Sequence, residues 1–326
     1  MINPISPDER AYRAQRAFEF AGPDLAGLVL FDDQFIQYYT GFVFIPTERP
    51  VALVITREGH RTLFVPRLEH EHALESAQVE EVSSYPEFPG EQHPLQLLGK
   101  LLGKLGLGRG LIGVDYDGYP PVMGYSGPAL SELCAVRRVS TALDRQMALK
   151  SEHELFLIRE SARWAEYAHR LLQRYTRPGL RESEVESRAT QEATQALQAA
   201  MGPGFRSQNK WVSGAVALFR GQIGPTSALP HAISTNAAFK PGDNLVTGAS
   251  AGVWGYLSEL ERTMFLGEPS PQQRRYSRHM LELQELALEQ LRPGRACAEV
   301  DRIVRAYYER EGLIPYWRHH VVWVTA

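Results

Sequence analysis

One stretch of the chain, residues 244–263, constrains the fold more than any other. Residues 244–254 form an apolar run typical of a strand, and residues 255–263 fit the second strand of a hairpin that carries Glu259 and Glu261. Residues two apart on a strand point to the same face, so we expect the two carboxylates side by side. Adjacent carboxylates repel unless a cation, a metal or an acid–base role separates their charges. Most neighbouring side chains are aromatic or aliphatic, which favours a functional site over two solvated surface glutamates.

Composition sets the broad class of protein. The chain has 326 residues, 44% of them hydrophobic, which is enough for a sizeable core and about two domains. A net charge of −3 gives no argument for nucleic acid or an anionic membrane surface as partner. Cys134 and Cys297 stand alone, which fits a reducing compartment. Residues 1–10 lack an apolar signal core and no run reaches the length of a membrane span, so we expect a cytoplasmic protein.

The chain is predicted to divide near residue 145 into a domain of residues 1–145 and a second of residues 146–326. In the first, predicted strands alternate with a predicted helix, which indicates a layered α/β domain. The strands are expected at residues 27–31, 51–55, 62–65 and 111–115, and the helix at residues 94–105.

The second domain is predicted to be α+β, with pairs of helices on either side of the hairpin. Ser151 and Glu154 form a capping-box pattern at the start of its first helix, and Ser183 and Glu186 repeat that pattern at the next. After the hairpin, Pro-Gly breaks separate one long helix, to about residue 291, from another that runs to residue 312.

The residues from Gly255 to Thr263, Gly-Tyr-x-x-x-Leu-Glu-Arg-Thr, resemble a strand of creatinase. Creatinase belongs to the pita-bread (M24) peptidase family, with aminopeptidase P, prolidase and methionine aminopeptidase. The resemblance implies a pita-bread catalytic domain. It also implies an Asp seven residues before the Gly-Tyr, and another at the Glu259 position, in members that bind metal. This chain has Gly248 at the first position and Glu at the second. We therefore expect the creatinase-like branch, with no bound metal and no cofactor.

Residues 38–49 are also similar to creatinase, without a gap. The resemblance implies that Arg49 reaches across a dimer interface toward the substrate of the partner, and so implies a homodimer. An ordinary solvent-facing arginine in a loop is the alternative.

His231 lies in a segment, residues 230–243, that resembles the one bearing the active-site histidine of the family. An imidazole takes up and releases a proton readily near pH 7, which suits general acid–base catalysis. A polar surface histidine is the alternative, and the position of His231 just before the hairpin favours the catalytic interpretation.

The last residues, 316–326, depart from the family pattern. Members continue into a Gly-His-Gly-like motif and further strands, whereas a reading frame shifted by two bases at Val322-Trp-Val-Thr-Ala326 would permit Val-Gly-His-Gly. We predict a truncation by frameshift or a misassigned gene end, an incomplete catalytic domain and little activity. His319 and His320 precede the ligand position and are not predicted as ligands, and the apolar residues 321–324 would form an exposed sheet edge.

The resemblance implies a hydrolase that cleaves a C–N bond of a small zwitterionic, amino-acid-like or peptide substrate without metal. His231 would shuttle protons and Glu261 would hold the cationic part of the substrate, with Glu259 and Arg49 also at the substrate. Two alternatives stay open: a metal-dependent Xaa-Pro aminopeptidase or dipeptidase, and an inactive, peptidase-like binding module.

Overall fold

The computed structural model describes residues 5–317. The chain forms two compact units that do not follow a single cut in the sequence. Unit 1 contains the residues up to Leu171, with Ala189–Ala217 and Ala249–Leu260. Unit 2 contains Leu172–Arg188, Leu218–Gly248 and the residues from Glu261 onward.

The first sheet of the chain has six strands in the order β4-β3-β2-β1-β5-β6. β1 pairs antiparallel with β2, as does β2 with β3, and the remaining neighbours are parallel. The register places Val29 between Val54 of β2 and Val114 of β5. The strands are β1 (Gly27–Leu30), β2 (Ala52–Thr56), β3 (Arg61–Pro66), β4 (Glu81–Tyr85), β5 (Ile112–Val114) and β6 (Val136–Arg138).

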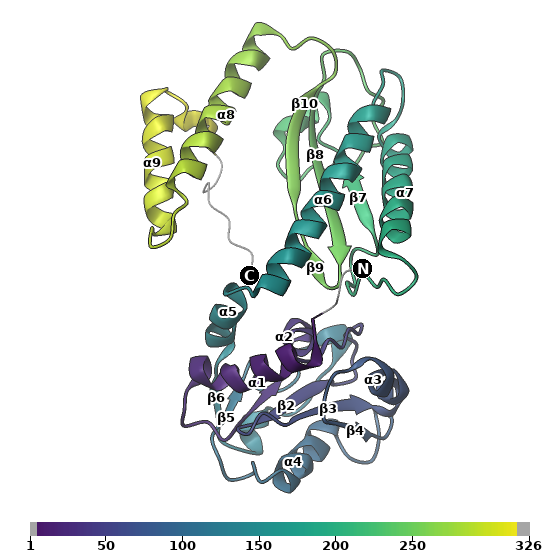
Figure 1. Cartoon of the computed structure of the whole chain (residues 1–326), viewed down its shortest axis with the longest axis vertical. Helices are drawn as coiled ribbons and strands as arrows, with labels where there is room; N and C mark the ends of the chain where they lie inside the picture. Colours follow the sequence, from purple (N-terminus) through teal and green to yellow (C-terminus); the bar gives the residue numbers. More distant parts are fainter. Residues whose placement is uncertain (1–4, 318–326) are drawn as a thin grey trace. The chain divides into compact units, whose positions relative to one another are not determined.

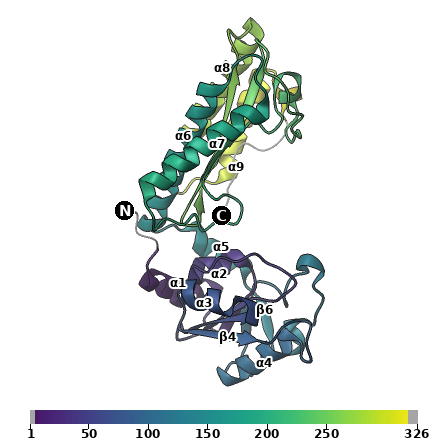
Figure 2. The same ribbon diagram turned by 90° about the vertical axis from the view of Figure 1, so that its right-hand side faces the viewer.

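Helices cover both faces of this sheet. Figure 1 shows α1 (Pro7–Ala21) and α2 (Asp33–Thr40) on one side and α4 (Pro94–Lys104) on the other, and Figure 2 shows the same separation in the turned view. α3 (His70–Ser76) and α5 (Ser140–Ala148) also contribute to the core on the α1 side. Successive residues of a strand pack into the cores on opposite faces of the sheet, as Leu28 does on one face and Val29 on the other. Burial on both faces explains why these strands read as continuous apolar runs.

The second sheet has the order β10-β8-β7, with β9 also paired to β8. The expected order of two helices, a hairpin and two further helices is observed. Leu283 of α8 packs with Val304 and Tyr307 of α9, and the two helices lie side by side in Figure 1. The elements are α6 (Glu152–Tyr175), α7 (Glu182–Met201), β7 (Ala215–Leu218), β8 (Asn244–Val253), β9 (Tyr256–Leu257), β10 (Leu260–Phe265), α8 (Pro271–Gln290) and α9 (Cys297–Arg310). Short 3-10 helices occur at Arg67–Glu69, Val122–Gly124, Leu130–Glu132, Gly224–Ala228 and Ile314–Tyr316.

The hairpin differs from the expected one in its second strand. Trp254 and Gly255 form a two-residue turn with φ of 49° and 88°, as tight hairpins require. The strand then breaks at Ser258 and Glu259 before β10 begins. At this break, Ser258 Oγ accepts a hydrogen bond from Ser161 Oγ of α6 at 2.8 Å. The expectation that Glu259 and Glu261 share one continuous strand is therefore wrong.

The two predicted capping boxes have different outcomes. Ser151 and Glu154 exchange the expected hydrogen bonds, with Ser151 N donating to Glu154 Oε2 at 2.8 Å and Glu154 N donating to Ser151 Oγ at 3.2 Å. Ser183 and Glu186 do not form a box, because the carboxylate of Glu186 accepts the amide of Phe219 instead. Within residues 5–317, no helix is long and apolar enough to cross a membrane. His319, His320 and residues 321–324 lie outside the described residues.

Candidate functional site

Three of the positions singled out by the sequence lie in unit 2. His231 follows the 3-10 helix Gly224–Ala228, Gly248 lies within β8 and Glu261 lies on β10. Because β8 is the central strand of the order β10-β8-β7, the sheet places Gly248 between the β7 edge and the β10 edge.

An arginine that the sequence did not single out connects these strands. Arg220 follows β7, and its guanidinium Nη1 forms an ion pair with Glu261 Oε1 on β10. The side chain passes beside Gly248, where an added Cβ would lie 3.6 Å from Cδ of Arg220 and 3.8 Å from Cδ1 of Leu218. The glycine thus leaves the surface of the central strand open to an arginine that reaches across it.

Two glutamates of α7 accept backbone hydrogen bonds from the turn that carries Arg220. Glu186 Oε1 accepts the amide of Phe219 at 2.5 Å, and Glu182 Oε1 accepts the amide of Gly221 at 2.7 Å. Arg220 has φ of 56° and Gly221 has φ of 68°, both in the left-handed region. Glycine is required at the second position, since a Cβ there would lie 2.6 Å from the carbonyl of Ile233.

The same buried carboxylate fixes the segment that follows His231. Glu182 is fully buried, and its Oε2 accepts a hydrogen bond from Ser234 Oγ at 2.6 Å. Gln222 Nε2 donates to the carbonyl of Leu229 at 3.0 Å on the other side of His231. Glu182 therefore links the Arg220 turn to the His231 segment, although the imidazole of His231 is itself exposed.

Burial is the largest influence on the pKa of Glu186, one of the two glutamates that hold the Arg220 turn. Burial raises the pKa of Glu186, the amide of Phe219 lowers it, and the neighbouring carboxylate of Glu182 raises it again. Two carboxylates in one half-buried layer are compatible with the fold because backbone amides and a hydroxyl satisfy their oxygens.

The expected enclosure of the glutamate pair is not observed. The side chain of Glu261 is 46% exposed, and Glu259 is also exposed in the break before β10. The apolar residues that flank them do not enclose them, since Leu257 is exposed and Leu260, Met264 and Phe265 are only partly buried. The guanidinium of Arg220 balances the charge of Glu261, which corresponds to the first of the three possibilities that the sequence left open, a cation, a metal or an acid–base role.

Arg49 lies in unit 1 and is held by two acidic side chains of the same chain. Its Nε donates to Glu87 Oε1 at 2.6 Å, and its Nη1 pairs with Glu48. These carboxylates raise the pKa of Arg49. The predicted reach toward a partner stays a prediction.

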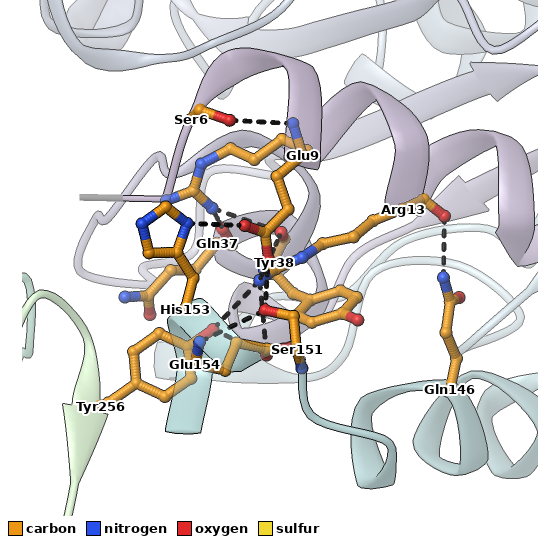
Figure 3. A network of polar contacts seen from close by, with 11 residues as sticks. Ser6, Glu9, Arg13, Gln37, Tyr38, Gln146, Ser151, His153, Glu154 and Tyr256 are labelled. Carbon is orange, nitrogen blue, oxygen red and sulfur yellow. Dashed lines mark hydrogen bonds and ion pairs between the residues drawn. The ribbon is translucent and has the colours of Figure 1, made fainter. Parts of the chain in front are cut away.

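A second polar network, within unit 1, fixes the tip of the hairpin. Figure 3 shows Glu9 and Arg13 of α1 converging on Glu154 and Tyr256. Tyr256 donates to Glu154 Oε1 at 2.8 Å, and Arg13 Nη2 lies 3.4 Å from the same oxygen. Burial is the largest cause that raises the pKa of Tyr256, so the phenol stays a hydrogen-bond donor.

Both parts of the chain match families of known proteins. Residues 157–324 match the family model of metallopeptidase family M24, and residues 10–126 match that of the creatinase/prolidase N-terminal domain. An uncharacterized peptidase of Staphylococcus aureus (strain USA300) is 23% identical over 286 residues, which cover 88% of this chain and 75% of that protein.

Solved structures of similar fold include two dipeptidases. The Xaa-Pro dipeptidase from Bacillus anthracis gives a TM-score of 0.73 at 21% identity, over 97% of this chain and 81% of that one. Dipeptidase PepE from Mycobacterium ulcerans gives a TM-score of 0.74 at 25% identity, over 96% of this chain and 79% of that one. The fold is thus an N-terminal α/β domain joined to a pita-bread domain.

Proposed function

Because the chain belongs to metallopeptidase family M24, we propose that it hydrolyses a C–N bond in a small zwitterionic, amino-acid-like or peptide substrate. The observation that carries this proposal is the shared anchor at Glu182, which holds the His231 segment beside the turn whose Arg220 pairs with Glu261. A titratable imidazole and a pair of opposite charges are then available on one compact unit.

In the proposed reaction, His231 acts as the proton shuttle. The imidazole takes a proton from water as the water oxygen bonds to the scissile carbon, and it returns that proton to the departing nitrogen as the C–N bond breaks. Glu261 holds the positive end of the substrate and so orients the scissile carbon toward His231.

The family name implies a metal, and the residues of the structure do not fit one. Among residues 5–317, no group of three or more His, Cys, Asp or Glu side chains is placed to hold a metal ion. Gly248 offers no side-chain ligand, which leaves Glu261 without the second carboxylate that a two-metal site would need at this strand pair. We therefore derive no step through a metal.

A metal-dependent Xaa-Pro dipeptidase is the second candidate, favoured by the names of the structural relatives. Hydrolysis of Xaa-Pro dipeptides that appears only when Mn²⁺ or Co²⁺ is added, and disappears with EDTA, would establish it over the first proposal.

The first proposal is tested by turnover of a substrate panel, creatine and Xaa-Pro dipeptides, after treatment with EDTA. We expect His231→Ala to lower kcat by roughly 10²–10⁴-fold with little change in KM, because proton transfer acts in the transition state. His60→Ala removes another partly exposed imidazole and serves as the matched control. Unchanged kcat without His231 would exclude its proposed role. Absence of turnover across the whole panel would refute hydrolysis by this chain, and it would fit either the inactive binding module or the predicted truncation.

A homodimer with Arg49 at the partner's substrate is a further proposal from the family resemblance. The pairing of Arg49 with Glu48 and Glu87 supports a fixed position for its guanidinium. Light scattering at several concentrations measures the oligomeric state, and a monomer throughout would exclude this role for Arg49.

A further inference from the structure

We propose that Arg220 recognises the carboxylate of a zwitterionic ligand, and that its ion pair with Glu261 opens to admit that ligand. The carboxylate end would bind the guanidinium of Arg220 and the ammonium end would bind Glu261. This inference rests on the proposed function, since it names the class of substrate that the same site accepts.

The position of Arg220 provides the first argument. Its side chain reaches beside Gly248 on the central strand to Glu261 on the neighbouring strand. The pair therefore presents one positive and one negative group over a strand surface that lacks a side chain at Gly248. A ligand with both charges finds a partner for each, and a ligand with one charge must leave one protein group unpaired.

Accessibility provides the second argument. The side chain of Arg220 is 33% exposed and that of Glu261 is 46% exposed, so a solute can reach both. Ion pairs at such exposure contribute little to stability. Opening the pair costs little, and a zwitterion that inserts between the two groups restores both interactions.

The backbone at Arg220 provides the third argument. A left-handed φ is uncommon for a residue other than glycine, and such conformations persist where the surrounding structure enforces them. Here Glu182 and Glu186 hold the amides on either side of Arg220, at Gly221 and Phe219. The guanidinium is thus attached to a fixed backbone, which reduces the entropy lost when it binds a carboxylate.

A neighbouring arginine supplies the control. Arg262 lies next to Glu261 on β10, is exposed, and donates from Nη1 to the backbone carbonyl of Glu261 at 2.7 Å. It carries the same charge as Arg220, lies on the strand that carries Glu261, and makes no ion pair with the Glu261 carboxylate among the contacts within residues 5–317.

The experiment measures binding of three probes to the full chain by NMR titration: delta-aminovalerate, n-pentylamine and valerate. None contains an acyl C–N bond, so hydrolysis cannot interfere. We expect delta-aminovalerate to bind at least about tenfold more tightly than either single-charge probe. Arg220→Gln should weaken delta-aminovalerate about tenfold without weakening n-pentylamine, whose ammonium no longer competes with Arg220 for Glu261, whereas Arg262→Gln should alter neither. Arg220→Lys should recover part of the affinity.

Several results would overturn the inference. The inference fails if Arg220→Gln lowers the affinity for delta-aminovalerate and for n-pentylamine equally. It also fails if Arg220→Gln and Arg262→Gln have equal effects on the affinity, or if delta-aminovalerate does not bind to the wild type. If Arg220→Gln does not fold, Glu261→Gln gives the reciprocal test, because it should weaken the two ammonium probes and spare valerate. The proposed function fails separately: carboxylate recognition without turnover refutes hydrolysis alone, and turnover without Arg220 dependence refutes this inference alone.

Discussion

Glu182 Oε2 accepts the hydroxyl of Ser234 at 2.6 Å, while its other carboxylate oxygen holds the amide of Gly221 at 2.7 Å. A single buried side chain of α7 therefore sets the separation of two loops that are distant from it in sequence. The Arg220 turn and the His231 segment are held in register by this one carboxylate.

Replacing this anchor should be costly. Glu182→Ala leaves the Gly221 amide and the Ser234 hydroxyl without their acceptor, so we expect the free energy of unfolding to fall by about 2–4 kcal/mol. Ser234→Ala removes one of the two bonds and should cost about 1 kcal/mol. Urea denaturation measures both, and hydrogen exchange should show loss of protection at Gly221 in Glu182→Ala only. Similar losses in the two variants would contradict the shared-anchor role.

Gly248 should tolerate a methyl group, whereas Gly252 should not. A Cβ at Gly248 would make ordinary contacts, at 3.6 Å to Arg220 and 3.8 Å to Leu218, and its backbone lies in a strand. Gly248→Ala should change the free energy of unfolding by less than about 0.5 kcal/mol. A Cβ at Gly252 would lie 2.5 Å from the carbonyl oxygen of Val212, so Gly252→Ala should cost about 1–3 kcal/mol. Thermal unfolding of the matched pair tests this, and a large loss in Gly248→Ala would show that the central strand is crowded.

Glu186 should give the stability a specific dependence on pH. Burial raises its pKa above the ordinary value of 4.5, so the folded state binds the proton more tightly than the unfolded state. The contribution of Glu186 to stability is fully present below pH 4.5, and it is lost as the pH rises through the raised pKa of Glu186 in the folded state. Glu186→Gln keeps an oxygen for the amide of Phe219 and removes the titration. The free energy of unfolding of Glu186→Gln relative to wild type should therefore increase as the pH rises from about 4 to 7.

Denaturant titrations across that pH range provide the measurement. Glu184→Gln is the control, because Glu184 lies on the same helix, is exposed and accepts the amide of Arg181. A constant difference between Glu186→Gln and wild type would show that Glu186 does not titrate differently on folding.

The network in Figure 3 should stabilise the hairpin tip through Tyr256. Tyr256→Phe removes the hydrogen bond to Glu154 while keeping the ring, and it should lower the free energy of unfolding by about 1 kcal/mol. A double-mutant cycle with Arg13→Met should show coupling, because Arg13 contacts the same oxygen of Glu154. Tyr12→Phe, at a residue 58% exposed, should have no measurable effect. Additive effects of the Tyr256 and Arg13 changes would be inconsistent with a shared network.

Local patterns predicted four of the six strands of the first sheet (β1, β2, β3 and β5), the helix α4, and the order of helices around the hairpin. They did not predict α1, α2, α3, α5, β4 or β6. Strands such as β2, buried on both faces, are recognisable as short apolar runs, and the Ser151–Glu154 box depends only on residues three apart. The predictions that failed concern features that depend on partners distant in the sequence. Glu186 accepts an amide 33 residues away, and Ser258 bonds a serine 97 residues away, so neither the absent box nor the strand break has a local signal.

The candidate site shows the same limit. The sequence indicated that Glu259 and Glu261 need a cation, a metal or an acid–base role beside them, and it identified the strand that carries Glu261. The partner, Arg220, lies 41 residues earlier and becomes a neighbour only through the order of strands in the sheet. The Phe219-Arg-Gly221 turn has one local signal, a glycine shortly after a strand-like run, which marks a tight turn without indicating where the arginine points.

The way the Arg220 turn is anchored also makes the site easy to diversify. Its supports are backbone amides held by α7, so they do not depend on which side chain stands at position 220. Gly221 is fixed by the adjacent carbonyl of Ile233, but the residue before it projects from a scaffold that needs no redesign. Selection in nature or in a laboratory library could thus change the charge presented at this position by single substitutions and leave the architecture around it intact.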